Sequence, residues 1–131
     1  MTPRRVRIQA GDHRFEALLS DTPAADAVWR ALPLQTRVST WGDEIYGDVG
    51  LQVALSADAT DIAEIGDVAI WPPGNALCIF FGPTPVSAQD ETRAASALAP
   101  VGHIEDADVA KLRSVPDGVI LTVEAAEGLL R

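Results

Sequence analysis

Two short stretches of the chain hold residue types that could form a binding site. Trp41, Glu44 and Tyr46 lie within TWGDEIYG, residues 40–47, and a second group lies within WPPGN, residues 71–75. Aromatic and proline side chains are rigid and lose little entropy on binding. We therefore predict that an apolar pocket for a small molecule or a peptide is lined by Trp41, Glu44, Tyr46, Trp71, Pro73 and Asn75. The alternative is that the aromatic side chains only fill the core.

Three polar residues near these aromatics have predictable roles. Asp43 and Glu44 are adjacent, so on a strand they point to opposite faces and cannot act together as acid and base. Glu44 and Tyr46 share a face, which makes them the better candidates for polar groups inside a pocket, although solvated surface carboxylates are more common. Cys78 lies in an apolar stretch and is expected to be an inert core thiol.

No other motif indicates a metal, a cofactor or a catalytic group. His13 and His103 are far apart in the chain, and neither has a second ligand at metal spacing. The glycines at 66 and 74 flank a predicted strand instead of opening a helix, so no phosphate-binding loop is expected. The sequence therefore predicts neither metal nor cofactor and identifies no catalytic residue.

Length and charge limit the kinds of partner. The chain has 131 residues, typical of one domain (1–131), and a formal net charge of −9. An acidic surface repels phosphate, so nucleic acid and anionic membranes are not expected partners, whereas a homo-oligomer is left open. There is no apolar run of about 18 residues and no signal peptide at the N-terminus, so a soluble, cytoplasmic protein is expected.

These candidate residues must be positioned by a mainly β fold. The alternation of polar and apolar residues predicts a hairpin from 5–9 and 14–19, and a final strand near 119–124. Thr22 followed by Pro23 predicts the start of a helix that ends before Pro33, with Trp29 facing the core. Asp106 or Asp108 is predicted to cap a second short helix.

The rest of the chain is expected to complete a barrel. Residues 68–71 and 76–81 are almost entirely apolar, as in strands buried on both sides. Short strands are expected at 51–54 and 100–104, and residues 88–97 are predicted to form a loop or a turn of helix. About eight short strands, two helices and no βαβ rhythm predict a closed, mainly antiparallel barrel with the helices packed over it.

Three segments resemble one known family. TWGDEIYG (40–47), GDVAIWPPGNALCIFFGPTP (66–85) and VGHIE (101–105) are similar to the small prokaryotic cyclophilin-like proteins, and the order of elements matches over nearly the whole chain. The resemblance implies a closed eight-stranded cyclophilin-like β-barrel capped by two short helices. Ordinary cyclophilins are peptidyl-prolyl isomerases that use an arginine on a central strand beside a pocket for the proline ring.

The residues that carry isomerase activity in ordinary cyclophilins are not matched in this chain. The segment that corresponds to the arginine strand, residues 39–46, contains no arginine, and Arg37 lies in a different context. The positions of the cyclophilin glutamine and proline-gripping phenylalanine are Ala76 and Cys78, and the pocket tryptophan and histidine have no counterpart at 90–99. The resemblance therefore implies a cyclophilin fold without cyclophilin catalysis. The alternative is a weak or atypical isomerase that uses Arg37 or a backbone donor.

Overall fold

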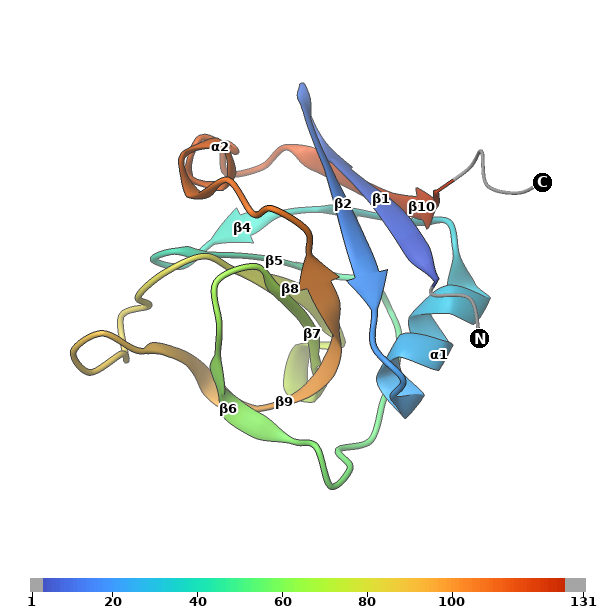
Figure 1. Ribbon diagram of the computed structural model, residues 1–131, viewed down its shortest axis with the longest axis horizontal. Helices are drawn as coiled ribbons and strands as arrows, with labels where there is room; N and C mark the ends of the chain where they lie inside the picture. Colours follow the sequence, from blue (N-terminus) through green and yellow to red (C-terminus); the bar gives the residue numbers. More distant parts are fainter. Residues whose placement is uncertain (1–3, 127–131) are drawn as a thin grey trace.

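The computed structural model describes residues 4–126 as a curled sheet with two α-helices against it (Figure 1). The helices are α1 (Pro23–Ala31) and α2 (Val109–Arg113), and a 3₁₀ turn, η1, spans Pro72–Gly74. The strands are β1 (Arg5–Ala10), β2 (His13–Leu19), β3 (Leu34–Arg37), β4 (Ser39–Thr40), β5 (Glu44–Asp48), β6 (Thr60–Ala63), β7 (Asp67–Trp71), β8 (Ala76–Phe80), β9 (Thr92–Ile104) and β10 (Ile120–Ala125). The prediction of a mainly β fold with two helices is confirmed.

The sheet is open, so the predicted closed, eight-stranded barrel is wrong in both strand number and closure. Ten strands form the order β3-β10-β1-β2-β9-β7-β8-β5-β4, with β6 paired to β9. The two edges, β3 and β4, are separated in the chain by Val38 alone. The Val38 N–H donates to Val119 O and its carbonyl accepts from Gly118 N, so Val38 pairs with the segment before β10. The strands β3 and β4 do not pair with each other, and the sheet stays open between them.

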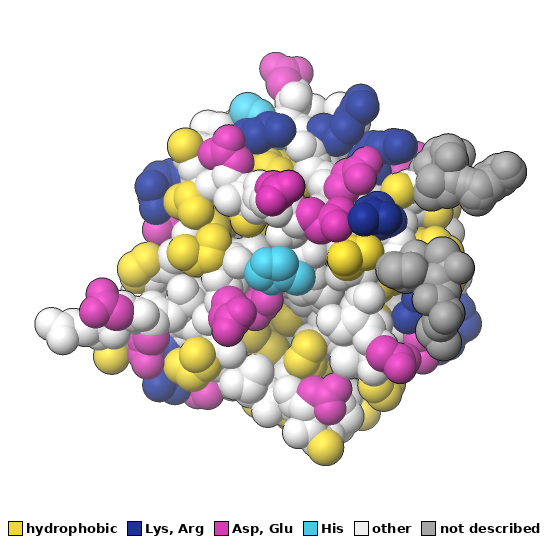
Figure 2. Space-filling model, viewed as in Figure 1, with side chains coloured by type: hydrophobic (Ala, Val, Ile, Leu, Met, Phe, Trp, Pro, Cys, Tyr) yellow, Lys and Arg dark blue, Asp and Glu magenta, His cyan; other side chains and the backbone are white. Residues whose placement is uncertain are grey.

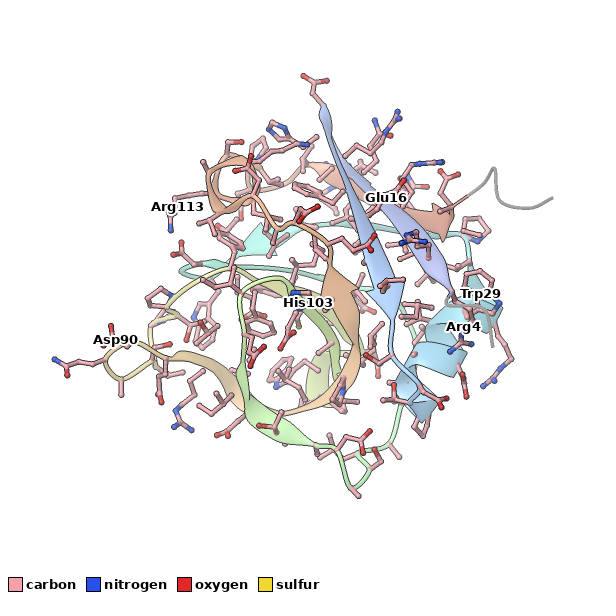
Figure 3. All side chains as sticks on the ribbon, viewed as in Figure 1. Arg4, Glu16, Trp29, Asp90, His103 and Arg113 are labelled. Carbon is pink, nitrogen blue, oxygen red and sulfur yellow. The ribbon has the colours of Figure 1, made fainter. Side chains whose placement is uncertain are left out.

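The first helix forms as the sequence predicts. Thr22 is its N-cap, with the Thr22 hydroxyl accepting from Ala25 N at 3.1 Å, and Pro23 occupies the first turn. The same hydroxyl donates to Pro100 O at 2.7 Å, which ties the helix to β9. Trp29 is only half-buried against the core, with the Arg4 guanidinium 5.8 Å from its ring centroid (Figure 3).

Strand β9 departs most from the sequence-based prediction. Residues 92–97, predicted as a loop or a turn of helix, are its first half, and the predicted strand at 100–104 is its second half. The pairing with β7 shifts by one residue between Val68 and Ala69, which face Gly102 and Pro100. Proline lacks the N–H that a regular ladder needs, and this irregularity lets Pro100 sit inside a long strand. The strand predicted at 51–54 is not formed.

Strand β8 has a core on each of its faces. Leu77 and Ile79 belong to the larger core, which includes β1, β2, β10 and α1. Ala76, Cys78 and Phe80 belong to a smaller core together with residues of β6, β7 and β9. The prediction that this segment is buried on both sides is confirmed, and the smaller core supports the candidate site. No helix in residues 4–126 is long and apolar enough to cross a membrane.

Candidate functional site: an aromatic pocket

A cavity of about 260 Å³ opens against the smaller core, and we call it the aromatic pocket. Its walls come from the segment before β5, from β5 itself, from the end of β7 and from β9. Seven residues line it: Trp41, Glu44, Tyr46, Trp71, Ala94, Ala95 and Leu98. Four of the six residues singled out from the sequence thus lie around one cavity, although they come from segments up to 30 residues apart (Trp41 to Trp71).

The β5 contribution follows from strand geometry. Glu44 and Tyr46 are two residues apart, so both side chains project from the same face of β5. Their partners on β8 are Phe80 and Cys78, which belong to the smaller core. Glu44 and Tyr46 therefore stand on a packed apolar base. Trp41 lies next to this strand because its N–H donates to the Glu44 carbonyl at 2.9 Å.

The WPPGN segment holds Trp71 at the pocket wall. Pro72–Gly74 form η1, and Asn75 adopts the left-handed conformation (φ 48°) that leads the chain into β8. A Cβ atom on Gly74 would lie 3.1 Å from the Trp71 ring, so the absence of a side chain there lets the ring pack on the turn. Trp71 Nε1 donates to Ser96 Oγ on β9 at 2.8 Å. The indole is thus fixed both by the turn and by β9.

Pro73 and Asn75 do not line the cavity. Pro73 is exposed and Asn75 is half-buried, with its N–H donating to Pro72 O at 3.1 Å. These two residues shape the turn that positions Trp71, and they lie outside the set of lining side chains. The rigid link between β7 and β8 is therefore a turn whose tryptophan belongs to the pocket.

The β9 wall is the part that sequence reasoning missed. Ala94 and Leu98 are buried on the pocket side, and Ala95 also lines the cavity. The segment TRAASALA contains four alanines among its eight residues, 92–99. Alanine favours helices and gives no clear apolar–polar alternation, so neither propensity nor period indicated a strand.

Glu44 is a buried acid in an apolar setting. Its side chain is 6% exposed, and burial raises the pKa of its carboxyl from 4.5 to about 7, against a smaller opposing effect of the Cys78 thiol. Burial and the nearby Glu44 carboxylate also raise the pKa of Cys78, so this residue stays a neutral thiol, as predicted. None of the ion pairs among residues 4–126 involves Glu44.

The other polar candidates lie elsewhere. Arg37 donates to Gly118 O at 2.8 Å and does not line the aromatic pocket. His103 pairs with Asp67 through Nδ1 at 2.9 Å, beside a smaller cavity of about 120 Å³, near the centre of the face in Figure 3. His13 Nε2 lies 2.8 Å from Ser114 Oγ at the C-terminal end of α2. No cluster of three potential metal ligands occurs in the described part of the chain.

Comparison with known proteins identifies relatives by both sequence and structure. A family model described as Cyclophilin-like matches residues 4–124. A hypothetical protein from Archaeoglobus fulgidus, known from its solution structure, is 37% identical, and the match covers 95% of each chain with a TM-score of 0.79. No curated protein matches the chain significantly. The resemblance inferred from the sequence motifs is confirmed.

Proposed function

This chain belongs to the cyclophilin-like family, and on that premise we propose that it is a binding domain whose aromatic pocket holds a small molecule or a peptide side chain. The observation that carries the proposal is the convergence of Trp41, Tyr46 and Trp71 with one buried carboxyl group around a single cavity. Ligand sites are mostly apolar concavities with a few placed polar groups, and this cavity has that composition.

The rigidity of the walls also supports binding. The Trp71 indole is fixed by the turn below it and by its hydrogen bond to Ser96. The Tyr46 ring packs on the smaller core through β8. Side chains that are already ordered lose little conformational entropy when a ligand arrives, so more of the contact energy appears as affinity.

A cavity of about 260 Å³ lies just below the roughly 300–1,000 Å³ range of typical small-molecule sites. The occupant we propose is therefore a compact group: a small molecule, or one side chain of a peptide. A longer peptide would have to leave most of its length outside the pocket.

Prolyl isomerisation has less support as a function. The barrier of roughly 18–20 kcal/mol arises from amide resonance, and a donor near the prolyl nitrogen lowers it. Arg37 is held by Gly118 O, and no arginine is among the seven residues that line the aromatic pocket. We therefore favour binding without isomerisation.

The proposal can be tested by nuclear magnetic resonance of ¹⁵N-labelled protein. The chain has three tryptophans, and two of them, Trp41 and Trp71, line the pocket, whereas Trp29 lies on α1 beside Arg4 (Figure 3). Compounds from a collection of small molecules and short peptides are expected to shift the indole N–H signals of Trp41 and Trp71 and leave that of Trp29 unchanged.

A pair of matched variants completes this test. Trp71→Ala should abolish the binding of any compound found, and Trp29→Ala should retain it. The proposal is contradicted if no compound in the collection shifts the Trp41 or Trp71 signal, or if the two variants bind equally well.

A further inference from the structure

The aromatic pocket combines three aromatic rings with one acidic group and no basic group. Of its seven lining residues, Glu44 is the one acidic residue, and the other six are aromatic or aliphatic. Arg93 precedes the lining residue Ala94 in the sequence, and its guanidinium forms salt bridges with Glu91 and Asp61, each at 2.7 Å. A deprotonated Glu44 is therefore a negative charge without a partner inside the described protein.

Aromatic rings and a carboxylate attract the same kind of ligand. The faces of tryptophan and tyrosine rings carry negative partial charge, and they bind cations most strongly where water is excluded. Methylated ammonium groups suit such sites because they are positively charged but weakly hydrated. We propose that the aromatic pocket binds a methylated ammonium group, with Trp41, Tyr46 and Trp71 around the cation and Glu44 as its counter-ion. This inference rests on the proposed binding function and specifies the chemistry of the ligand.

The net charge of the whole chain also favours a cationic ligand. The formal net charge is −9, and Figure 2 shows Asp and Glu side chains distributed over the visible face. A negative field raises the local concentration of cations and lowers that of anions at a cleft. Inorganic anions and carboxylate ligands are disfavoured at this pocket by both the local and the global charge.

Occupancy by a cation also explains how a buried acid is accommodated. An isolated carboxylate is costly to bury unless an opposite charge compensates it. Tyr46 and Cys78 are the other titratable groups on the packed faces around Glu44, and neither a phenol nor a thiol can carry a positive charge, so neither compensates the carboxylate. A bound ammonium ion would supply the missing charge and favour the deprotonated form of Glu44.

The decisive comparison is between choline and its uncharged carbon isostere, in which a tert-butyl group replaces the trimethylammonium group. The two probes have nearly the same shape, so a difference in affinity reports the charge. Isothermal titration calorimetry near pH 8 is expected to show at least a roughly ten-fold tighter dissociation constant for choline. Equal affinity for both probes, or tighter binding of the isostere, would overturn the inference.

Two variants identify the counter-ion. Glu44→Gln should weaken choline binding about ten-fold and leave the isostere unaffected, because the amide keeps the shape and removes the charge. Glu124→Gln, on β10 and outside the pocket, removes one negative charge from the surface and should change neither affinity. An equal loss in both variants would show that only the net charge matters and would contradict the role of Glu44.

The pH dependence provides a third readout. The pKa of Glu44 is about 7, so the deprotonated fraction rises roughly ten-fold between about pH 6 and about pH 8. If the protonated form binds choline about ten-fold more weakly, as expected for Glu44→Gln, the choline affinity of the wild-type protein should rise about five-fold over this range and stay nearly constant in Glu44→Gln. A wild-type affinity that is independent of pH would overturn the inference.

Failure of this inference can be distinguished from failure of the proposed function. If uncharged compounds shift the Trp41 and Trp71 signals as strongly as choline does, the pocket binds ligands but not by charge. If nothing shifts those signals, the binding function itself is wrong. A short peptide containing trimethyllysine, compared with free choline, shows whether the ammonium group comes from a protein side chain or from a free metabolite, since the true source should bind more tightly.

Discussion

Replacing Glu44 by glutamine should make the free protein more stable at alkaline pH. Burial raises the pKa of Glu44 from 4.5 to about 7, so the folded state holds this proton more tightly than the unfolded state does. One pKa unit corresponds to about 1.36 kcal/mol, so the difference between the folded and unfolded pKa of Glu44 corresponds to about 3 kcal/mol of unfolding free energy. Because the pKa is raised in the folded state, the Glu44 proton stabilises the fold at low pH. This contribution to the free energy of unfolding is complete below about pH 4.5 and is lost as the pH rises through about 7.

The glutamine side chain of Glu44→Gln does not ionise, so this variant does not lose stability in this way as the pH rises. The free energy of unfolding of the variant relative to the wild type should therefore shift by about 3 kcal/mol in favour of the variant between about pH 4.5 and about pH 8. For a chain of this size, such a shift corresponds to roughly 10 °C in Tm. Urea unfolding at a series of pH values, without added ligand, measures it.

The other carboxyl groups do not disturb the comparison. Ion pairing with Arg93 and Arg5 lowers the pKa values of Glu91 and Glu105, which gives the opposite pH dependence, but both residues are present in the two proteins and cancel in the difference. Glu124→Gln serves as the matched control, because it makes the same chemical change at an exposed side chain on β10. A difference in unfolding free energy between Glu44→Gln and the wild type that varies by less than about 0.5 kcal/mol over this pH range would show that burial does not raise the pKa of Glu44.

Three further predictions concern the turn that holds Trp71, the pairing of β2 with β9 and prolyl isomerisation. Trp71→Ala should abolish ligand binding and cost less than the roughly 3–5 kcal/mol typical of a fully buried aromatic, because the ring is half-exposed; urea unfolding and calorimetry measure the two effects. Gly102→Ala should destabilise the protein by about 3 kcal/mol or prevent folding, because the new Cβ would meet Leu18 O where β2 and β9 pair; circular dichroism on heating detects it. The protein should not accelerate isomerisation of an Xaa-Pro peptide in a protease-coupled assay, and any acceleration that Arg37→Ala removes would contradict the binding-only account, since Arg37 is engaged by Gly118 O.

The helix starts and the turn before β8 could be predicted from the sequence, because each depends on one or two neighbouring residues. Thr22 followed by Pro23 marks a helix start through one side-chain hydrogen bond and one fixed dihedral angle, and the structure has both. Asp108 caps α2 in the same way, by accepting from Lys111 N at 3.1 Å. Asn75 takes the left-handed conformation for which asparagine and glycine are the usual residues.

The closure of the sheet and the path of β9 were not predictable in this way. Closure depends on which strand edges meet, and Val38 bonds to residues 118 and 119, which are distant in sequence. Strand β9 contains both an alanine-rich segment and Pro100, each of which favours another structure locally. Its pairing with three other strands, β2, β6 and β7, overrides those preferences.

The pocket was predictable in part. Glu44 and Tyr46 follow from the two-residue period of a strand, and Trp41 and Trp71 from aromatic residues beside glycine and proline. Ala94, Ala95 and Leu98 carry no chemical signal and join the pocket only through the fold. Pro73 and Asn75 are predicted to line the pocket because they neighbour Trp71, whereas in the structure they belong to the turn that positions it.

Intermolecular nuclear Overhauser effects can show directly whether a ligand binds in the aromatic pocket. With choline, or with the tightest binder found, we expect contacts from the ligand methyl protons to the rings of Trp41 and Trp71 and to the methyl groups of Leu98. Contacts to Trp29 instead, or a bound ligand with no contact to either pocket tryptophan, would contradict the claim that the aromatic pocket is the binding site of this protein.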